Sequence, residues 1–274
     1  MTAEFDGRVA LIAGASRGIG AGTAEAWARA GAAVVIAARS TGALAEVAAK
    51  ITDAGGRALA VPTDVTDPMA MQELVDRTLA TYGRLDFAFN NATGGPMPAP
   101  LADIEVDGFD AGIAANVRGT FLGMKYQIPA MLAGGGGVIV NMASVAGVRA
   151  TANLGAYVTG KAAIIAMTKV AALDYADRGI RVNVVAPGPI LTEHLTAAGS
   201  TAQQMAAKSV PMQRIGTVAE VADTVLWLCS ARASFITGIT LPIDGGQSAG
   251  HKPPQMYRQG EGMAPEQSGK GESS

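Results

Sequence analysis

The segment VALIAGASRGIG, residues 9–20, decides the fold of this chain of 274 residues. It opens with five apolar residues, which is typical of a strand buried on both faces, and continues through glycines at 14, 18 and 20 into a helix-period segment. Glycines let the backbone turn sharply, and the free N–H groups of the following helix attract an anion such as a pyrophosphate. A tight strand-to-helix connection needs glycine even without a ligand, but the position after the first strand favours nucleotide binding.

Short apolar runs and helix-period segments alternate along the rest of the chain. The predicted strands are 9–13, 34–37, 58–61, 85–89, 138–140, 182–185 and 239–243. The predicted helices are 19–30, 43–53, 68–82, 109–131, 156–176 and 218–228. Strands that alternate with helices predict an α/β fold with a doubly wound parallel sheet. Because no gap interrupts the alternation, we expect a single domain over residues 1–247.

Three segments depart from this alternation. Residues 91–100 form a loop rich in Gly and Pro, and residues 187–211 form a long connection with one short helical patch at 202–208. Long loops often cover a binding site, so we interpret the second as a lid. Residues 248–274 contain no Leu, Ile, Val, Phe or Trp and predict a polar, weakly folded C-terminal tail. The alternative is an arm that contacts a neighbouring subunit through Met256 and Tyr257.

Composition excludes several classes of protein. The net charge is −2 and charged residues make up 16% of the chain, so no basic surplus is available to bind nucleic acid or anionic lipid. The histidines are His194 and His251 and the single cysteine is Cys229, which leaves few ligands for a transition metal. The uncharged residues 126–148 contain Pro129 and a run of glycines, and therefore predict a helix end, a turn and a buried strand rather than a membrane span. One cysteine and the absence of a secretory signal predict a cytoplasmic protein.

Tyr157 and Lys161 lie four residues apart in a predicted helix, so their side chains share one face. An ammonium in a poorly solvated site stabilises a neighbouring phenolate. Lowering a tyrosine pKa by about three units takes roughly 4 kcal/mol. For an isolated pair the alternative is two solvated residues on a helix surface, but the other motifs of the chain favour a catalytic pair.

Together these motifs resemble the short-chain dehydrogenase/reductase family, in its compact single-domain branch, over residues 7–246. The matching residues are Gly14, Gly18, Gly20, Asp64, Val65, Asn90, Asn91, Ala92, Asn116, Ser144, Tyr157, Lys161, Pro187, Gly188 and Thr192. Ser144 lies in the segment NMASVAG, residues 141–147, which is similar to the family's catalytic-serine segment. The resemblance implies a Rossmann fold and a homotetramer. Alanines that would allow close helix contact between subunits are Ala162, Ala163, Ala166, Ala171 and Ala172; the alternative is that they pack on the sheet.

The resemblance implies an oxidoreductase that transfers a hydride between a nicotinamide and a secondary alcohol or its carbonyl. Tyr157 is then the general acid/base. Lys161 lowers the pKa of that phenol and holds the nicotinamide ribose, and Ser144 hydrogen-bonds the substrate oxygen. Asn116 holds a water that links Lys161 to solvent. The alternatives are that Ser144 caps a turn and that Asn116 satisfies backbone groups.

The resemblance also implies a dinucleotide site. Asp64 would accept a hydrogen bond from the adenine, with Val65 near the ring, and Thr192 would contact the nicotinamide carboxamide. Asn91 and Ala92 would line the adenosine side. The complete expected set is Gly14, Ser16, Arg17, Gly18, Ile19, Gly20, Arg39, Asp64, Val65, Asn91, Ala92, Tyr157, Lys161, Pro187, Gly188, Ile190 and Thr192. Two residues depart from the family pattern: Ala13 stands in place of Thr, and Thr93 stands in place of Gly, which puts the position of the following loop in doubt.

The end of the second predicted strand indicates the nucleotide. It reads AARS, residues 37–40, without the acid that would accept ribose hydroxyls and repel a 2′-phosphate. Arg17 and Arg39 could bind such a phosphate together. We therefore predict NADP(H), with NAD(H) as the alternative, and a small alcohol or ketone as substrate.

Two other functions remain open on this fold. One is a protein that senses a dinucleotide without turning over a substrate. Such a sensor would not need Ser144, Tyr157 and Lys161, so the presence of all three argues against it. The other is a sugar-nucleotide epimerase or dehydratase, which would carry a larger C-terminal substrate domain than residues 248–274 provide.

Overall fold

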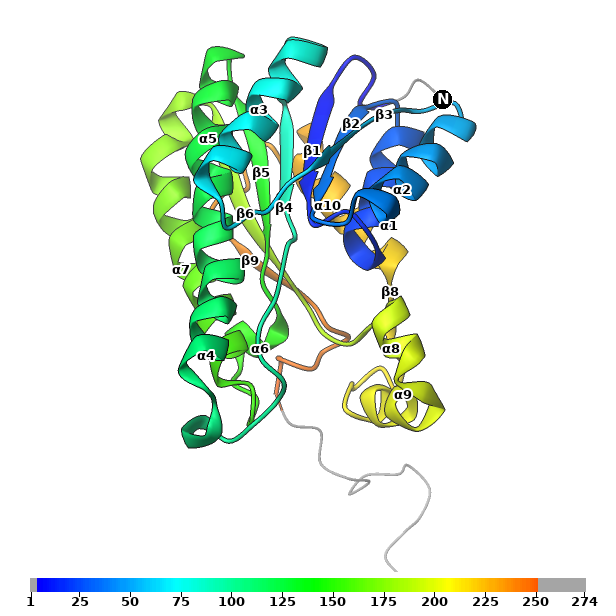
Figure 1. Ribbon diagram of the computed structural model, residues 1–274, viewed down its shortest axis with the longest axis vertical. Helices are drawn as coiled ribbons and strands as arrows, with labels where there is room; N and C mark the ends of the chain where they lie inside the picture. The colour runs from blue at the N-terminus through cyan, green and yellow to red at the C-terminus, as the bar shows by residue number, and fades with distance from the viewer. Residues whose placement is uncertain (1–3, 251–274) are drawn as a thin grey trace, which may run out of the picture.

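Seven parallel strands form the central sheet of the computed structural model, which describes residues 4–250 (Figure 1). They are β1 (Val9–Ala13), β2 (Ala33–Ala38), β3 (Arg57–Pro62), β4 (Phe87–Asn90), β5 (Gly137–Met142), β6 (Ile180–Pro187) and β9 (Thr240–Ile243). Their order across the sheet is β3-β2-β1-β4-β5-β6-β9, and each neighbouring pair is parallel. Each predicted strand overlaps one of these strands. The predicted α/β fold with a doubly wound parallel sheet is therefore confirmed.

Helices cover both faces of this sheet. One face carries α1 (Gly18–Arg29), α2 (Thr41–Asp53) and α10 (Val218–Cys229), and the other carries α3 (Pro68–Tyr82), α5 (Gly119–Ala133) and α7 (Gly155–Tyr175) (Figure 1). Successive strand residues point to opposite faces, so Ile12 packs in the core with Trp27 of α1 and Leu11 in the core with Leu74 of α3. Both sides of the strand are buried, which explains its uninterrupted apolar sequence.

The strand order reverses at β1. The chain builds β1, β2 and β3 outward to one edge, then returns to pair β4 with β1 and continues to β9 at the other edge. At such a reversal the loops after the two adjacent strands diverge to opposite faces of the sheet and leave a crevice at the carboxyl ends. The glycine turn after β1 and the loop after β4 both border this point. The fold thus brings the predicted site segments to one edge.

The predicted helix at 109–131 is interrupted. α4 spans Val106–Ile113, a π-helical turn follows at Ala114–Arg118, and α5 continues from that turn. Single π turns inside α-helices are frequent at functional sites. Residues 126–148 contain the end of α5, a glycine turn and β5, so the interpretation of this stretch is confirmed.

The connection at 187–211 contains more secondary structure than the sequence predicts. It holds β7 (Ile190–Leu191), α8 (Glu193–Ala197) and α9 (Gly199–Lys208), and β7 pairs with β8 (Gly216–Thr217). In Figure 1, α8 and α9 lie at the same end of the molecule as α4 and the short helix α6 (Val145–Val148). Single 3₁₀ turns occur at Leu101–Asp103, Ala176–Arg178 and Ala231–Ala233. The predicted contacts of Met256 and Tyr257 lie outside the described residues.

One segment, Gly155–Arg178, is long and apolar enough to cross a membrane by length and composition alone. It consists of α7 and the following 3₁₀ turn. Ile164, Ala171 and Ala172 of α7 are buried against the strands of the sheet. In this fold the helix therefore serves as one of the core helices.

Candidate active site

The glycine turn after β1 forms one wall of the site. The N–H groups of Gly14 and Ala15 both donate to the Ala37 carbonyl, at 2.7 and 3.1 Å, so the chain leaves β1 in a tight curve with Gly14 at φ 84°. A Cβ on Gly20 would collide with the Gly14 carbonyl oxygen, which explains the glycine there. α1 begins at Gly18, and its N-cap residue Arg17 makes no side-chain capping bond. The first N–H groups of α1 are therefore left for an anion.

Asn91 holds the glycine turn in place. Its backbone N–H donates to the Ala13 carbonyl at 2.9 Å, and its Nδ2 donates to the Gly14 carbonyl at 2.8 Å. A Cβ on Gly14 would lie 2.6 Å from the Ala92 nitrogen, so the two segments pack without space for a side chain. Asn91 and Ala92 thus support the turn from the β4 side.

The two predicted phosphate-binding arginines are exposed. Among residues 4–250 neither Arg17 nor Arg39 has a carboxylate within 4.0 Å of its guanidinium. Asp64 accepts hydrogen bonds from the Thr66 N–H and hydroxyl at 2.9 and 2.8 Å. These bonds, with a smaller contribution from the charge of Arg39, hold the pKa of Asp64 below its usual value. Arg39 and Asp64 therefore lie near each other at the carboxyl ends of β2 and β3.

The remaining predicted cofactor residues lie around the same crevice. Val65 packs against Gly119 at the start of α5, and Ser16 and Ile19 are half-buried in the turn and in α1. Gly188 donates to the Ile243 carbonyl at 3.0 Å, which joins the end of β6 to β9. Thr192 approaches Gly18, where a Cβ would lie 3.4 Å from the threonine methyl. Pro187 and Ile190 are buried. The connection at 187–211 thus begins beside the N-terminus of α1.

Lys161 and Tyr157 of α7 lie close together, as their spacing predicts. Lys161 is 1% exposed, its Nζ donates to the Met142 carbonyl at 3.0 Å, and Nζ lies 5.5 Å from the centre of the Tyr157 ring. Burial lowers the pKa of Lys161 to about 7, because the ammonium loses its hydration. An ammonium with this pKa carries only part of its charge at neutral pH.

The pKa of Tyr157 differs from the expected direction. Burial raises it, while the neighbouring Ser144 hydroxyl acts in the opposite direction. Without a bound nucleotide, desolvation of the buried phenol therefore outweighs the Ser144 hydrogen bond, and the lowering expected from Lys161 stays a prediction.

Ser144 reaches the pair because two short segments pack closely. Its hydroxyl accepts a hydrogen bond from the Ala146 N–H at 3.1 Å and caps α6. A Cβ on Gly147 would lie 2.7 Å from the Lys161 carbonyl carbon, so α6 sits directly against α7. The same serine thus caps the turn and borders the phenol.

Asn116 is fully buried in the π turn. Its Nδ2 donates to the carbonyls of Gly94 and Gly112 at 2.7 and 2.8 Å, and its Oδ1 accepts from the Thr93 hydroxyl at 2.9 Å. Both amide hydrogens are therefore used by the protein, as in the backbone-satisfying alternative. A water held by Asn116 would have to use one of its oxygens.

A buried amide network, which sequence reasoning missed, lies beneath this site. Asn90 and Gln127 exchange two hydrogen bonds, at 3.1 and 2.9 Å, and Asn90 also donates to Asn141 at 2.9 Å. Asn141 then donates to the Thr168 hydroxyl at 2.9 Å, which connects β5 to α7. The only sequence signal was a set of amides next to apolar strands. A satisfied buried network of this kind fixes the relative position of its elements.

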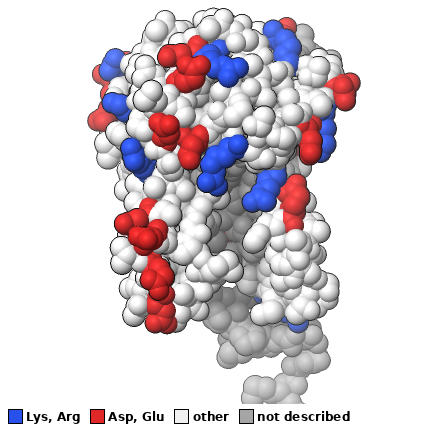
Figure 2. Space-filling view, in the orientation of Figure 1, with Lys and Arg blue, Asp and Glu red and all other residues white. Residues whose placement is uncertain are grey.

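Several large apolar side chains are exposed on the segments that lie at this end of the molecule. Met97, Leu101, Val148, Leu191, Met205 and Met212 are exposed, with 84%, 74%, 47%, 44%, 68% and 64% of their surface accessible. Leu101 packs on Gly155, two residues before Tyr157, and Val148 ends α6. In Figure 2, mainly uncharged atoms line the hollow between the lobe that carries α4 and the lobe that carries α8 and α9.

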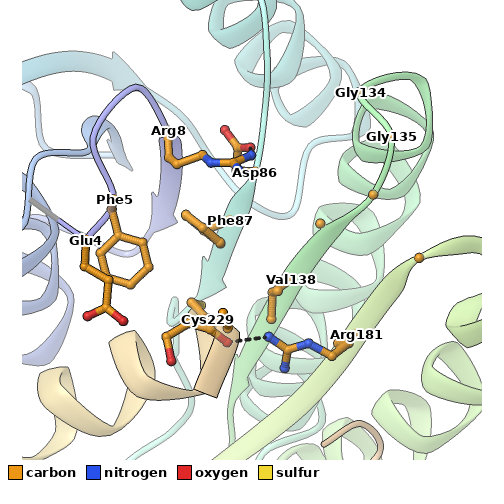
Figure 3. Close-up of a pocket in the computed structure, with 15 residues that line it drawn as sticks. Glu4, Phe5, Arg8, Asp86, Phe87, Gly134, Gly135, Val138, Arg181 and Cys229 are labelled. Atoms are coloured by element: carbon orange, nitrogen blue, oxygen red, sulfur yellow. Dashed lines mark hydrogen bonds and ion pairs between the residues drawn. The ribbon is translucent and has the colours of Figure 1, made fainter. Parts of the chain in front are cut away.

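A second hollow, of about 380 Å³, lies at the opposite edge of the sheet. Figure 3 shows Arg8 next to Asp86, and Arg181 pointing toward the end of α10. Arg8 pairs with Asp86 at 2.8 Å, and Arg181 donates to the carbonyls of Ser230 and Ile236 at 3.3 and 3.1 Å. Arg8 and Arg181 of this hollow thus already have hydrogen-bond partners within the protein. Within residues 4–250, no cluster of three or more potential metal ligands occurs.

Comparison with known sequences gives a consistent result. The family model described as enoyl-(acyl carrier protein) reductase matches residues 14–248. The chain is 41% identical over 243 residues to an A-factor type γ-butyrolactone 1′-reductase from Streptomyces virginiae, covering 87% of this chain and 95% of that protein. It is 39% identical over 249 residues to a cyclohexanol dehydrogenase from an Acinetobacter species, covering 91% and 98%.

Solved structures agree with these relatives. A short-chain type dehydrogenase/reductase from Mycobacterium ulcerans superposes with a TM-score of 0.87 at 31% identity, covering 90% of this chain and 91% of that one. An NAD⁺-bound xylitol dehydrogenase gives a TM-score of 0.84 at 36% identity, covering 89% and 100%. With the site geometry above, these matches show that the chain belongs to the short-chain dehydrogenase/reductase family of oxidoreductases.

Proposed function

We propose that the protein interconverts a secondary alcohol and its ketone, prefers NADP(H), and uses Tyr157 as the general acid/base. The observation that carries the proposal is the buried Lys161 ammonium, 5.5 Å from the Tyr157 ring and beside the Ser144 hydroxyl. A strongly perturbed lysine next to a phenol is costly for stability and typical of a catalytic site.

The residues of the crevice fit a dinucleotide. The turn around Gly14 and Gly20 has no space for side chains, and the N-terminus of α1 offers free N–H groups to a pyrophosphate. A nicotinamide bound there supplies the hydride donor or acceptor. Asp64 and Val65 would hold the adenine end, and Thr192 with Ile190 the nicotinamide end.

Each catalytic side chain has a separate task. The Tyr157 hydroxyl donates a proton to the carbonyl oxygen during reduction and removes it from the alcohol during oxidation. The Ser144 hydroxyl hydrogen-bonds the same oxygen as charge develops there. Lys161 holds the nicotinamide ribose, and its protonated form stabilises the Tyr157 phenolate. Asn116 keeps the π turn in place beside Lys161.

The preference for NADP(H) rests on Arg17 and Arg39. Both guanidiniums are exposed at the nucleotide end without an ion-pair partner among the described residues, and β2 ends at Ala38 without an acid. Each charge-assisted bond to a 2′-phosphate contributes about 1.5 to 3 kcal/mol. Replacing Ala38 by Asp together with Arg39 by Ser should therefore move kcat/KM toward NAD(H). Equal kcat/KM for both nucleotides in the wild type, or no change in the double variant, would contradict this preference.

The apolar entrance supports a substrate without charge. The relatives include proteins named for cyclohexanol and for a γ-butyrolactone, both compact ring compounds. Exposed methionines such as Met97, Met205 and Met212 adapt their shape to such rings. We therefore propose cyclic secondary alcohols and the corresponding ketones as the substrate class.

A panel of cyclic and open-chain alcohols and ketones, assayed with NADP(H) and NAD(H), tests the function. Turnover of at least one cyclic substrate is the expected result. Tight nucleotide binding without turnover of any compound would favour the sensor instead. That result would contradict the proposed hydride transfer and leave nucleotide binding intact.

Assembly into a homotetramer is part of the proposal. Phe121 of α5 and Val170 and Leu173 of α7 expose 49%, 57% and 83% of their surface, which supports contacts between copies along these helices. Ala162 and Ala166 are also exposed, whereas Ala171 and Ala172 are buried in their own subunit and cannot form the interface as expected. Sedimentation equilibrium measures the mass of the assembly, and a monomer would contradict this part.

A further inference from the structure

Thr93 occupies a position between two parts of the site. Its hydroxyl donates to Asn116 Oδ1 at 2.9 Å, and the neighbouring Gly94 carbonyl accepts from Asn116 Nδ2 at 2.7 Å. Two residues earlier, Asn91 holds the Gly14 carbonyl at 2.8 Å. A short segment from Asn91 to Gly94 thus connects the glycine turn to the π turn through side-chain hydrogen bonds.

The π turn in turn packs on the catalytic helix. A Cβ on Gly160, the residue before Lys161, would lie 3.0 Å from the Asn116 Cβ. A Cβ on Gly112 would lie 3.2 Å from the Ala156 Cβ, next to Tyr157. These contacts leave almost no space between α7 and the segment formed by the end of α4 and the π turn, so a displacement of Asn116 would be transmitted to α7.

The Thr93 hydroxyl donates to Asn116 Oδ1; the asparagine is fully buried, whereas Thr93 itself lies at the surface. Asn116 uses both of its amide hydrogens on carbonyls, so without Thr93 its oxygen would have no donor among these residues. An unpaired buried acceptor is unfavourable, and the local structure would open to admit water.

We propose that Thr93 is a positioning residue of this enzyme: its hydroxyl locks the Asn116 amide, and so fixes the π turn against the helix that carries Tyr157 and Lys161. The proposal rests on the function proposed above only in calling that helix catalytic. It assigns a task to the residue that departs from the family pattern. The loop after Asn91 is therefore held by the threonine side chain itself.

The test compares three variants of the full chain. Thr93→Val removes the hydroxyl at nearly constant volume, and Thr93→Ser keeps it. Thr81→Val, at an exposed position near the end of α3, is the matched control for the same chemical change. Hydrogen exchange of the amides at 112–118 and NMR titration of the Lys161 side chain are measured for each variant, both without any substrate.

In Thr93→Val we expect exchange at 112–118 to be about 5-fold to 150-fold faster, the equivalent of one unpaired buried acceptor. The pKa of Lys161 should move up from about 7, because water reaches the loosened helix turn. With a substrate from the panel, kcat should fall about fivefold or more while the cofactor Kd stays within about twofold, because Asn91 still holds the glycine turn. Thr93→Ser should restore wild-type behaviour in all of these measurements.

Two results would overturn the proposal. Exchange at 112–118 in Thr93→Val equal to that in Thr81→Val would show that the hydroxyl locks nothing. Faster exchange with an unchanged Lys161 titration would restrict Thr93 to the loop and end its positioning role. Because neither measurement needs turnover, an enzyme that reduces no compound of the panel would contradict the proposed function and leave this test decisive.

Discussion

Replacing Lys161 by Met should stabilise the folded protein near neutral pH, and this gain should disappear as the pH rises. The pKa of Lys161 is about 7 in the folded state and 10.5 for an ordinary lysine, so folding must either remove a proton or bury a charge. At 1.36 kcal/mol per pH unit, the penalty is about 5 kcal/mol well below pH 7, about 4 kcal/mol at pH 7.5 and about 1.5 kcal/mol at pH 9.5. Methionine has a similar length and carries no charge. The variant also leaves the Met142 carbonyl without its donor, which costs about 1 to 3 kcal/mol at either pH.

Urea unfolding of the cofactor-free protein measures this effect. The free energy of unfolding of the wild type, relative to Lys161→Met, should increase by about 2.5 kcal/mol between pH 7.5 and 9.5, because the unfolded chain binds the extra proton in that range. Groups common to both proteins cancel in the comparison. Lys169→Met, at an exposed position of the same helix, should show no such pH-dependent difference. Parallel pH dependences for the wild type and Lys161→Met would refute the burial of a titrating ammonium.

Three further substitutions test the site and the fold. Tyr157→Phe should lower kcat by about 10²-fold to 10⁴-fold with an unchanged cofactor Kd, because it removes the transferable proton and keeps the ring; near-native kcat would refute the acid/base role. Gly20→Ala places a methyl group against the Gly14 carbonyl, so fluorescence titration should show at least about tenfold weaker cofactor binding. Burial acts to raise the pKa of Asp86, but hydrogen bonds from arginines, first Arg84, hold it below the usual value. Wild-type stability should therefore fall as the pH drops below about 4, and thermal unfolding of Asp86→Asn should lack this loss. An equal loss of stability at low pH in both proteins would contradict the pairing of Asp86 with the arginines.

The sheet could be predicted because its buried strands require uninterrupted apolar runs. A strand covered by helices on both faces, such as β1 with Leu11 and Ile12, requires apolar residues at every position, so its position can be read from sequence. The helix that carries Tyr157 and Lys161 was predicted for a related reason, since residues four apart share one face of any helix. These features depend on local periodicity and are insensitive to the details of packing.

Other features escaped because they depend on contacts between distant segments. α8 is too short to show a period, and its N-cap residue Thr192 lies beside Gly18, which is far away in sequence. The π turn in the predicted helix at 109–131 was missed, since the partners of its Asn116 side chain, Gly94 and Thr93, lie about twenty residues away in sequence.

By itself the sequence determined the parallel sheet, the glycine turn, the helix that carries Tyr157 and Lys161, and the family, because repeating apolar periods and glycine positions are local properties of the chain. Only the tertiary structure decided the electrostatics. The pKa of Lys161 falls and that of Tyr157 rises because both lie in a core assembled from distant segments, where burial removes the water that would stabilise their charged forms. The same holds for Thr93. In the sequence it only put the position of the loop after Asn91 in doubt, whereas in the fold its hydroxyl donates to the buried Asn116.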